Sequence, residues 1–80
     1  MIYPLDYGYL KGISGGDGHE LDVWRGTAIE AKLDTIVCTV DLLKKDVEIK
    51  LLVGCTEEEK TKVINFHNES EWMAAVLLKR

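Results

Sequence analysis

The sequence is poor in the residues that cross-link or stiffen small proteins. Its 80 residues include two cysteines, Cys38 and Cys55, and one proline, Pro4. Both cysteines lie in or beside apolar runs rather than at the spacings of a disulfide framework, which is typical of buried, reduced thiols. We therefore expect a cytoplasmic protein whose stability comes from packing, and not a disulfide-rich secreted scaffold.

Long apolar runs and an excess of positive charge are also missing. No stretch approaches the roughly 20 apolar residues that cross a bilayer, and the first residues lack the pattern of a signal peptide. The chain carries 14 acidic and 10 basic residues, for a formal net charge of −4. Nucleic acid requires a clustered basic surface, so neither a membrane nor a nucleic acid is expected as a partner. The acidic groups are better suited to collecting cations.

The length indicates a single domain, 1–80, with a modest hydrophobic core. A core of this size is marginal without partners, so we expect a homo-oligomer. Residues 1 to about 20 are rich in glycine and tyrosine, which excludes a helix and favours a loop with short strand pieces. Residues 20–24 then alternate, with Leu21 and Val23 on one side, as in a half-buried strand.

A β-hairpin is predicted in the middle of the chain. Residues 35–42 and 46–53 alternate with period two and are separated by a short basic turn at 43–45. The apolar pattern predicts that the inward side chains are Ile36, Cys38, Val40 and Leu42, facing Val47, Ile49, Leu51 and Val53. The opposite, polar face then gathers Asp41, Asp46 and Glu48 near one end of the hairpin, with Lys50 one pleat further along.

A helix is expected over residues 57–67. Thr56 and Glu59 have the spacing of a capping box, and acidic residues fill the first turn, where the helix dipole favours anions. Residues 72–78 fit either a strand or a second helix, because alanine and leucine favour a helix while so short a length suits both. A closing strand is the favoured interpretation.

Two aspartates in this chain are placed as metal ligands would be. Asp17 lies between Gly16 and Gly18, so ligands can approach it closely, and Asp22 projects from the following strand. Two carboxylates brought together in this way are hard oxygen ligands suited to Mg²⁺ or Mn²⁺. The simpler interpretation is a solvated turn, since aspartate in a glycine-rich loop commonly has that role.

These residues belong to a longer pattern. The segments YPLDYGY (residues 3–9) and GDGHELDV (residues 16–23) resemble the signature of the family I inorganic pyrophosphatases, Tyr-Pro-x-Asn-Tyr-Gly-Tyr followed by Asp-Gly-Asp-Pro-x-Asp-Val. Residues 48–53 resemble the Asp-x-Lys-Leu-Val strand of that family more weakly. The resemblance implies a small, partly open antiparallel β-barrel of OB-like type, truncated relative to the family, with one helix packed across it.

The resemblance also implies a site and a reaction. By similarity the metal ligands are Asp17, Asp22 and Glu48, the catalytic residues are Asp17, His19 and Asp22, and the substrate-binding residues are Tyr7 and Lys50. The family hydrolyses pyrophosphate to two phosphates with Mg²⁺ held by such carboxylates, and Mn²⁺ is a possible substitute. The expected partner is pyrophosphate or a related small phosphoanhydride.

The chain departs from the family pattern at several positions. His19 stands where the family has the middle acidic residue of its motif. An imidazole can accept a proton near neutral pH, although a solvated loop residue is the alternative. The strands that precede this motif in the family have no counterpart here, so dimerisation through an unpaired sheet edge is expected. Two functions stay open: an active hydrolase, or a degenerate member that binds metal or phosphate or assembles with partners.

Overall fold

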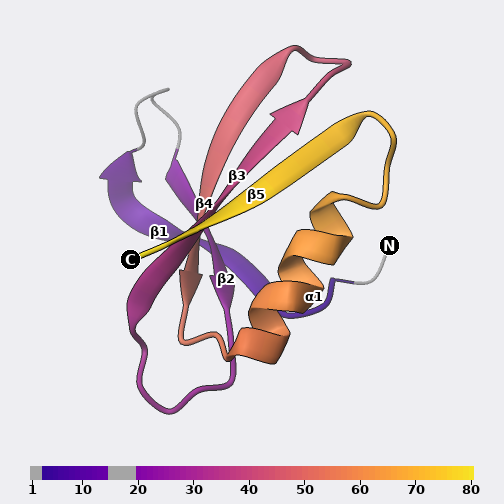
Figure 1. Ribbon diagram of the computed structural model, residues 1–80. Coiled ribbons are helices and arrows are strands. Elements are labelled where there is room, and N and C mark those ends of the chain that lie inside the picture. Colours follow the sequence, from indigo (N-terminus) through magenta and orange to yellow (C-terminus); the bar gives the residue numbers. More distant parts are fainter. Residues whose placement is uncertain (1–2, 15–19) are drawn as a thin grey trace.

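The chain forms five strands and one helix (Figure 1). The computed structural model describes residues 3–14 and 20–80. In chain order the elements are β1 (Asp6–Ser14), β2 (Glu20–Arg25), β3 (Leu33–Asp41), β4 (Asp46–Val53), α1 (Glu57–His67) and β5 (Met73–Lys79). The predicted class, a mainly-β domain of the α+β type with one helix, is confirmed by this arrangement.

All five strands belong to one sheet with the order β1-β2-β4-β3-β5. β1 pairs with β2, and β3 pairs with both β4 and β5, in each case antiparallel. β2 and β4 lie side by side in parallel, a contact between segments that are far apart in the sequence. β1 and β5 are the edges, so the sheet formed by the described residues is open and does not close on itself.

The N-terminal region is more regular than its glycines predicted. The expectation of a loop with short strand pieces is wrong for β1, which runs for nine residues. Its pairing with β2 shifts register between Tyr9 and Ser14, and Gly12 within this interval has a φ of 76°. Glycine adopts such a positive φ at little cost, so the strand absorbs an irregularity there instead of ending.

The hairpin is confirmed, but its predicted inward face is wrong. The buried side chains of β3 and β4 are Thr35, Val37, Thr39, Lys50 and Leu52. Val47 and Ile49, which were expected to point inward, are 63% and 49% exposed. The side on which α1 packs decides which face is buried, and that is a tertiary contact. The apolar pattern of the hairpin could not supply it, because both faces carry residues that tolerate burial.

The hydrophobic core lies between α1 and the sheet. Its fully buried members are Trp24 on β2, Val37 on β3, Leu52 on β4 and Val63 on α1. Partly buried apolar side chains surround them, among them Tyr7, Phe66 and Leu77. Trp24 thus connects the core to the face of the sheet that carries the predicted site.

The start of α1 follows the prediction. The Thr56 hydroxyl accepts a hydrogen bond from the Glu59 backbone N–H at 3.2 Å, and the Glu59 carboxylate accepts one from the Thr56 N–H at 2.8 Å. This is the predicted capping box, and the observed helix, Glu57–His67, has the predicted bounds. Glu59 also accepts hydrogen bonds from the backbone and hydroxyl of Thr27, so the cap ties the helix to the loop after β2.

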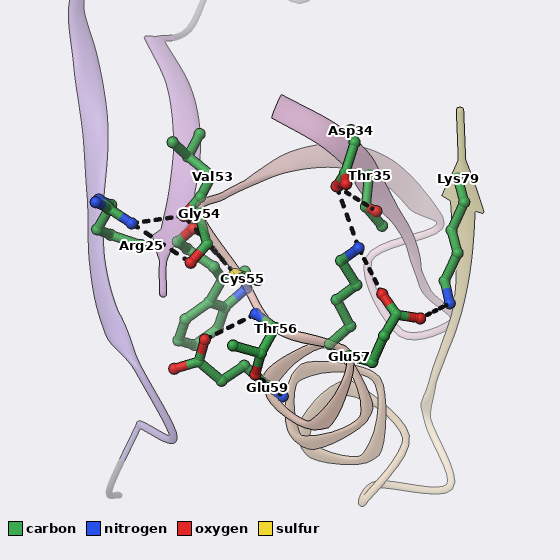
Figure 2. A network of polar contacts seen from close by, with 12 residues as sticks. Arg25, Asp34, Thr35, Val53, Gly54, Cys55, Thr56, Glu57, Glu59 and Lys79 are labelled. Carbon is green, nitrogen blue, oxygen red and sulfur yellow. Dashed lines mark hydrogen bonds and ion pairs between the residues drawn. The ribbon is translucent and has the colours of Figure 1, made fainter. Parts of the chain in front are cut away.

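A network of polar contacts fastens this end of the helix to the sheet (Figure 2). The Lys60 ammonium lies 3.2 Å from Asp34 Oδ1 and 2.7 Å from Glu57 Oε2, and Glu57 also pairs with Lys79 on β5. On the other side of Figure 2, the Arg25 guanidinium donates to the carbonyl oxygens that end β4. With its N-terminal end held at several points, the helix presents its C-terminal residue, His67, to the sheet at a defined position.

The C-terminal segment is a strand, as predicted. β5 pairs with β3 over seven residues, from Lys79 opposite Thr35 to Met73 opposite Asp41. Both cysteines are free and partly buried, also as predicted. Among the described residues, no helix combines the length and the apolar character that crossing a bilayer requires.

Candidate functional site

Four polar side chains from three strands meet on the helix-facing side of the sheet. At their centre is the Lys50 ammonium, whose side chain is buried. It lies 2.8 Å from the Tyr7 hydroxyl oxygen, 2.9 Å from Asp22 Oδ2 and 3.0 Å from Glu48 Oε2. An ammonium has three N–H donors, and here each one has an acceptor.

The sheet topology explains why these residues meet. Asp22 on β2 lies beside Lys50 on β4 in the parallel register, and Tyr7 on β1 lies beside Trp24, two residues after Asp22. Residues two apart on a strand share a face, so Glu48 is on the same side as Lys50. The parallel contact between β2 and β4 is therefore what assembles the cluster.

The ionisation states within the cluster are coupled. Burial disfavours the charge on Lys50, but its hydrogen bonds to Tyr7, Asp22 and Glu48 outweigh burial and raise its pKa well above the usual range. Burial likewise opposes the charge on Asp22, while the hydrogen bond from Lys50 lowers the pKa of its carboxyl below the ordinary value. For Tyr7, burial dominates and raises the pKa of the phenol. At neutral pH the site thus holds one ammonium, an ionised Asp22 and a neutral phenol.

A second polar pair lies beside the cluster. The Trp24 indole N–H donates a hydrogen bond to His67 Nε2 at 3.1 Å, and both side chains are buried. Because Nε2 accepts, the neutral imidazole carries its proton on Nδ1. Burial, reinforced by the positive charge of Lys50, lowers the pKa of His67 below its usual value. His67 is therefore a neutral group at the edge of the site.

A cavity of about 370 Å³ opens over this part of the sheet. Tyr7, Glu48 and Lys50 contribute to its floor, and His67 and the ring of Tyr3 also line it. Further polar lining comes from the far end of the β3–β4 hairpin, with Asp41, Lys44 and Asp46, and from Glu69 and Ser70 between α1 and β5. A cavity of this size accommodates a small ligand, and its mixture of aromatic and charged walls is typical of a binding site.

The polar face predicted for the hairpin is confirmed. Asp41, Asp46 and Glu48 line the same cavity, with Lys50 further along β4. Two of these carboxylates have structural partners: Asp41 Oδ1 accepts hydrogen bonds from the backbone of the turn that follows it, and Asp46 Oδ1 accepts one from Val47 N–H. Glu48 instead points its carboxylate at Lys50, so it is the member of this set that belongs to the cluster.

The predicted site residues fall into two groups. Tyr7, Asp22, Glu48 and Lys50 lie together, around the Lys50 ammonium. Asp17 and His19 lie outside the described residues. In the described part of the chain, no group of three or more His, Cys, Asp or Glu side chains is arranged to hold a metal ion.

The carboxylates nevertheless have the chemistry that a divalent cation requires. Asp22 and Glu48 each engage Lys50 through one of their two oxygens, and the Tyr7 phenol also lowers the pKa of the Asp22 carboxyl. Carboxylate oxygens are preferred ligands of Mg²⁺, which binds through one or two carboxylates and keeps several waters. The residues present therefore fit Mg²⁺, with the Lys50 ammonium as its competitor for the same two carboxylates.

His67 was not predicted as a site residue. Its spacing from Val63 and Ile64 placed it on the buried face of the helix, and that signal alone could have located it near the sheet. Its contact with Trp24 depends on how α1 crosses β2, which no local pattern encodes.

Comparison with known proteins finds no family model, no curated protein and no solved structure that matches this chain. The functional argument therefore depends on the residues and their geometry.

Proposed function

We propose that this protein is a relative of the family I inorganic pyrophosphatases that hydrolyses pyrophosphate to two phosphates with Mg²⁺. One observation carries the proposal. The sequence pattern selected four described residues as site residues, and three of them, Tyr7, Asp22 and Glu48, surround the ammonium group of the fourth, Lys50. These residues come from three strands, and Tyr7 and Lys50 are 43 positions apart in the chain. In the same proposal, the open sheet of the described residues corresponds to part of the partly open barrel of that family.

Each residue of the cluster has a role that suits this reaction. Lys50 donates hydrogen bonds and positive charge to a phosphate oxygen, and the neutral Tyr7 phenol donates a further hydrogen bond. Asp22 and Glu48, together with Asp17, would hold the cation through their carboxylate oxygens. A bound divalent cation neutralises phosphate charge and lowers the pKa of an attacking water. His19, two residues after Asp17 in the sequence, is assigned as the group that accepts the proton from that water.

The two free thiols support a reducing compartment for this activity, because such compartments keep cysteines from pairing. The proposal therefore places the protein in the cytoplasm.

A second candidate has an observation in its favour. The Lys50 ammonium sits between Asp22 and Glu48, so the carboxylates are already partly neutralised without any added cation. A site with this balance can bind a phosphate group at Lys50 without supporting turnover. The alternative is thus a metal-binding or phosphate-binding module that does not catalyse hydrolysis.

Release of inorganic phosphate from Mg²⁺-pyrophosphate tests the proposal. We expect the wild-type protein to release phosphate, and Lys50→Met to lower kcat/KM by about 10²–10³-fold, the usual cost of losing one stabilising donor. Asp46→Asn is the matched control, because Asp46 lines the same cavity but binds its own strand. If Asp46→Asn reduces turnover as much as Lys50→Met, the assignment of the site is wrong.

Calorimetry with Mg²⁺ separates the two candidates. Lys50→Met removes the competing ammonium, so we expect it to bind Mg²⁺ more tightly than the wild type, whereas Asp22→Asn should bind it more weakly. This pattern without phosphate release would support the binding module and overturn hydrolysis. Failure to bind either Mg²⁺ or phosphate would overturn both.

A further inference from the structure

The face of the sheet opposite α1 is an apolar surface that no described residue covers. Two rows of side chains cross it from β4 through β3 to β5. One row is Leu51, Ile36 and Leu78, and the next is Ile49, Cys38 and Val76. We call this surface the open face. Figure 1 shows α1 lying against the other side of the sheet.

The side chains of the open face are apolar, and several of them are about half exposed to solvent. Ile49 is 49% exposed, Val76 is 59% exposed and Leu78 is 54% exposed. The three side chains that complete the rows, Ile36 and Cys38 of β3 and Leu51 of β4, are partly exposed. Neither row contains a charged or polar side chain other than the thiol of Cys38. A contiguous apolar surface of this kind marks an interaction site in a folded protein.

The total surface area of the chain indicates how much of it needs a partner. A folded monomer of this mass, 9.0 kDa, is expected to expose about 4,900 Å² of accessible surface. The chain exposes 5722 Å². The excess, about 800 to 900 Å², equals the area that each partner buries in a stable protein dimer of standard size, about 800 Å².

The open face supplies a large part of this excess. Strands lie about 4.8 Å apart and rise about 3.3 Å per residue, so the three strands β4, β3 and β5, each of about seven residues, present a face of about 330 Å² in projection. The relief of the side chains increases the accessible area further.

We propose that two copies of this chain associate through their open faces to form a symmetric dimer. The two sheets stack face to face about 10 Å apart, as in β-sandwiches, and the helices lie on the outside. A surface without charges has no complement for a charged partner, whereas a second copy offers the same apolar rows. The site around Lys50 lies on the opposite, helix-facing side of each sheet, so both sites remain open in the dimer. This proposal does not depend on the proposed hydrolysis.

The mass in solution tests the proposal first. Sedimentation at protein concentrations from micromolar to millimolar should give twice the monomer mass at the higher concentrations. Ile49→Glu should abolish the dimer, because it places an unpaired charge in one of the two apolar rows. Its side chain is half exposed in the single chain, so folding should survive. Leu43→Glu, at an exposed position in the β3–β4 turn, is the matched control and should leave the dimer intact.

The reactivity of the two thiols in the wild-type protein provides a second test that needs no variant. Cys38 lies on the open face between Ile49 and Val76, whereas Cys55 lies beyond the end of β4. Peptide mass spectrometry after alkylation should show the labelling rate of Cys38 falling about tenfold at concentrations 100-fold above the dissociation constant. The rate for Cys55 should stay constant.

Three outcomes would overturn the proposal. A monomer at every concentration would show that the open face does not associate with itself. A dimer in which Cys38 stays as reactive as in the monomer would place the interface elsewhere, for example at the free edge of β5. A dimer that survives Ile49→Glu would exclude the open face as well.

Discussion

The hydrogen bond between Trp24 and His67 couples the protonation of the His67 imidazole to the packing of the Trp24 indole. The imidazole can accept the indole N–H only while Nε2 is unprotonated. Protonation of His67 would therefore leave two buried N–H groups facing each other, beside the positive charge of Lys50. Protonation of His67 should therefore destabilise the contact between α1 and β2.

A pH dependence of stability follows from this residue. The pKa of His67 is lowered in the folded state from its ordinary value of 6.5. Above that pH the imidazole is neutral in both states. As the pH falls below it, the unfolded chain takes up the proton first, so the free energy of unfolding decreases until the pH reaches the folded-state pKa. Urea unfolding between pH 5 and pH 8 measures this slope.

His67→Gln should remove the part of the slope that belongs to this position. The matched variant His19→Gln reports how much belongs to the other histidine. The prediction is wrong if His67→Gln unfolds with the same pH dependence as the wild type.

At the scale of elements, the capping box at the start of α1 was predicted from the sequence and is present in the structure. Thr56→Ala removes the hydroxyl that accepts the Glu59 N–H, so we expect the free energy of unfolding to fall by about 1 kcal/mol. Thr61→Ala is the control, because the Thr61 hydroxyl only bonds back to the carbonyl of Glu57 within the helix. Equal effects of the two substitutions on urea unfolding would contradict a role for the cap.

Gly26 lies where the ends of β2 and β4 meet. Among the described glycines, it has the closest backbone neighbours. A Cβ added at Gly26 would lie 2.4 Å from the carbonyl oxygen of Gly54 and 2.6 Å from Cys55 Cα. These are backbone atoms, so the clash can be relieved only by moving one strand end away from the other. A Cβ added at Gly8 on β1 meets no atom within 4 Å.

We therefore expect Gly26→Ala to destabilise the protein by about 2 kcal/mol, in the range typical of overpacking. Gly8→Ala should change the stability by less than about 0.5 kcal/mol, as is usual for open surface positions. Thermal unfolding of the two variants gives the comparison. A melting temperature of Gly26→Ala equal to that of Gly8→Ala would show that the junction is not tightly held.

At the scale of the whole molecule, the strand order predicts how protection from hydrogen exchange is distributed. β4 is bonded on both sides, by β2 and β3, whereas β1 and β5 each have one neighbour. Amides of β4 should therefore exchange most slowly and those of the edge strands fastest. Exchange measured by NMR checks this order. Outward-facing amides of β5 that exchange as slowly as β4 would indicate a partner strand on that edge, contrary to the proposed dimer.

The features predicted correctly are those that neighbouring residues determine. The bounds of α1 follow from Thr56 and Glu59, and the alternation of residues 20–24 and of the hairpin gives β2, β3 and β4. The length of β1 was missed because its regularity comes from pairing with β2, which glycines tolerate. The buried face of the hairpin was missed because α1 selects it, and Thr35 and Lys50 enter the core only with partners for their polar atoms.

The candidate site was predicted in part for a similar reason. The sequence pattern selected Tyr7, Asp22, Glu48 and Lys50, and the sheet brings them together. It did not reveal that Lys50 would lie between the two carboxylates, because that position depends on the parallel register of β2 and β4. Nor did it reveal the pairing of His67 with Trp24, which depends on how the helix crosses the sheet.

The place of Lys50 between Asp22 and Glu48 has a consequence for how the protein reaches its folded state. The chain carries a counter-ion for its own carboxylates, covalently attached and present from synthesis. Assembly of this region consequently requires no ion from the surroundings, in contrast to small domains that stay unfolded until a metal arrives. A chelator should therefore leave the melting temperature of the protein unchanged.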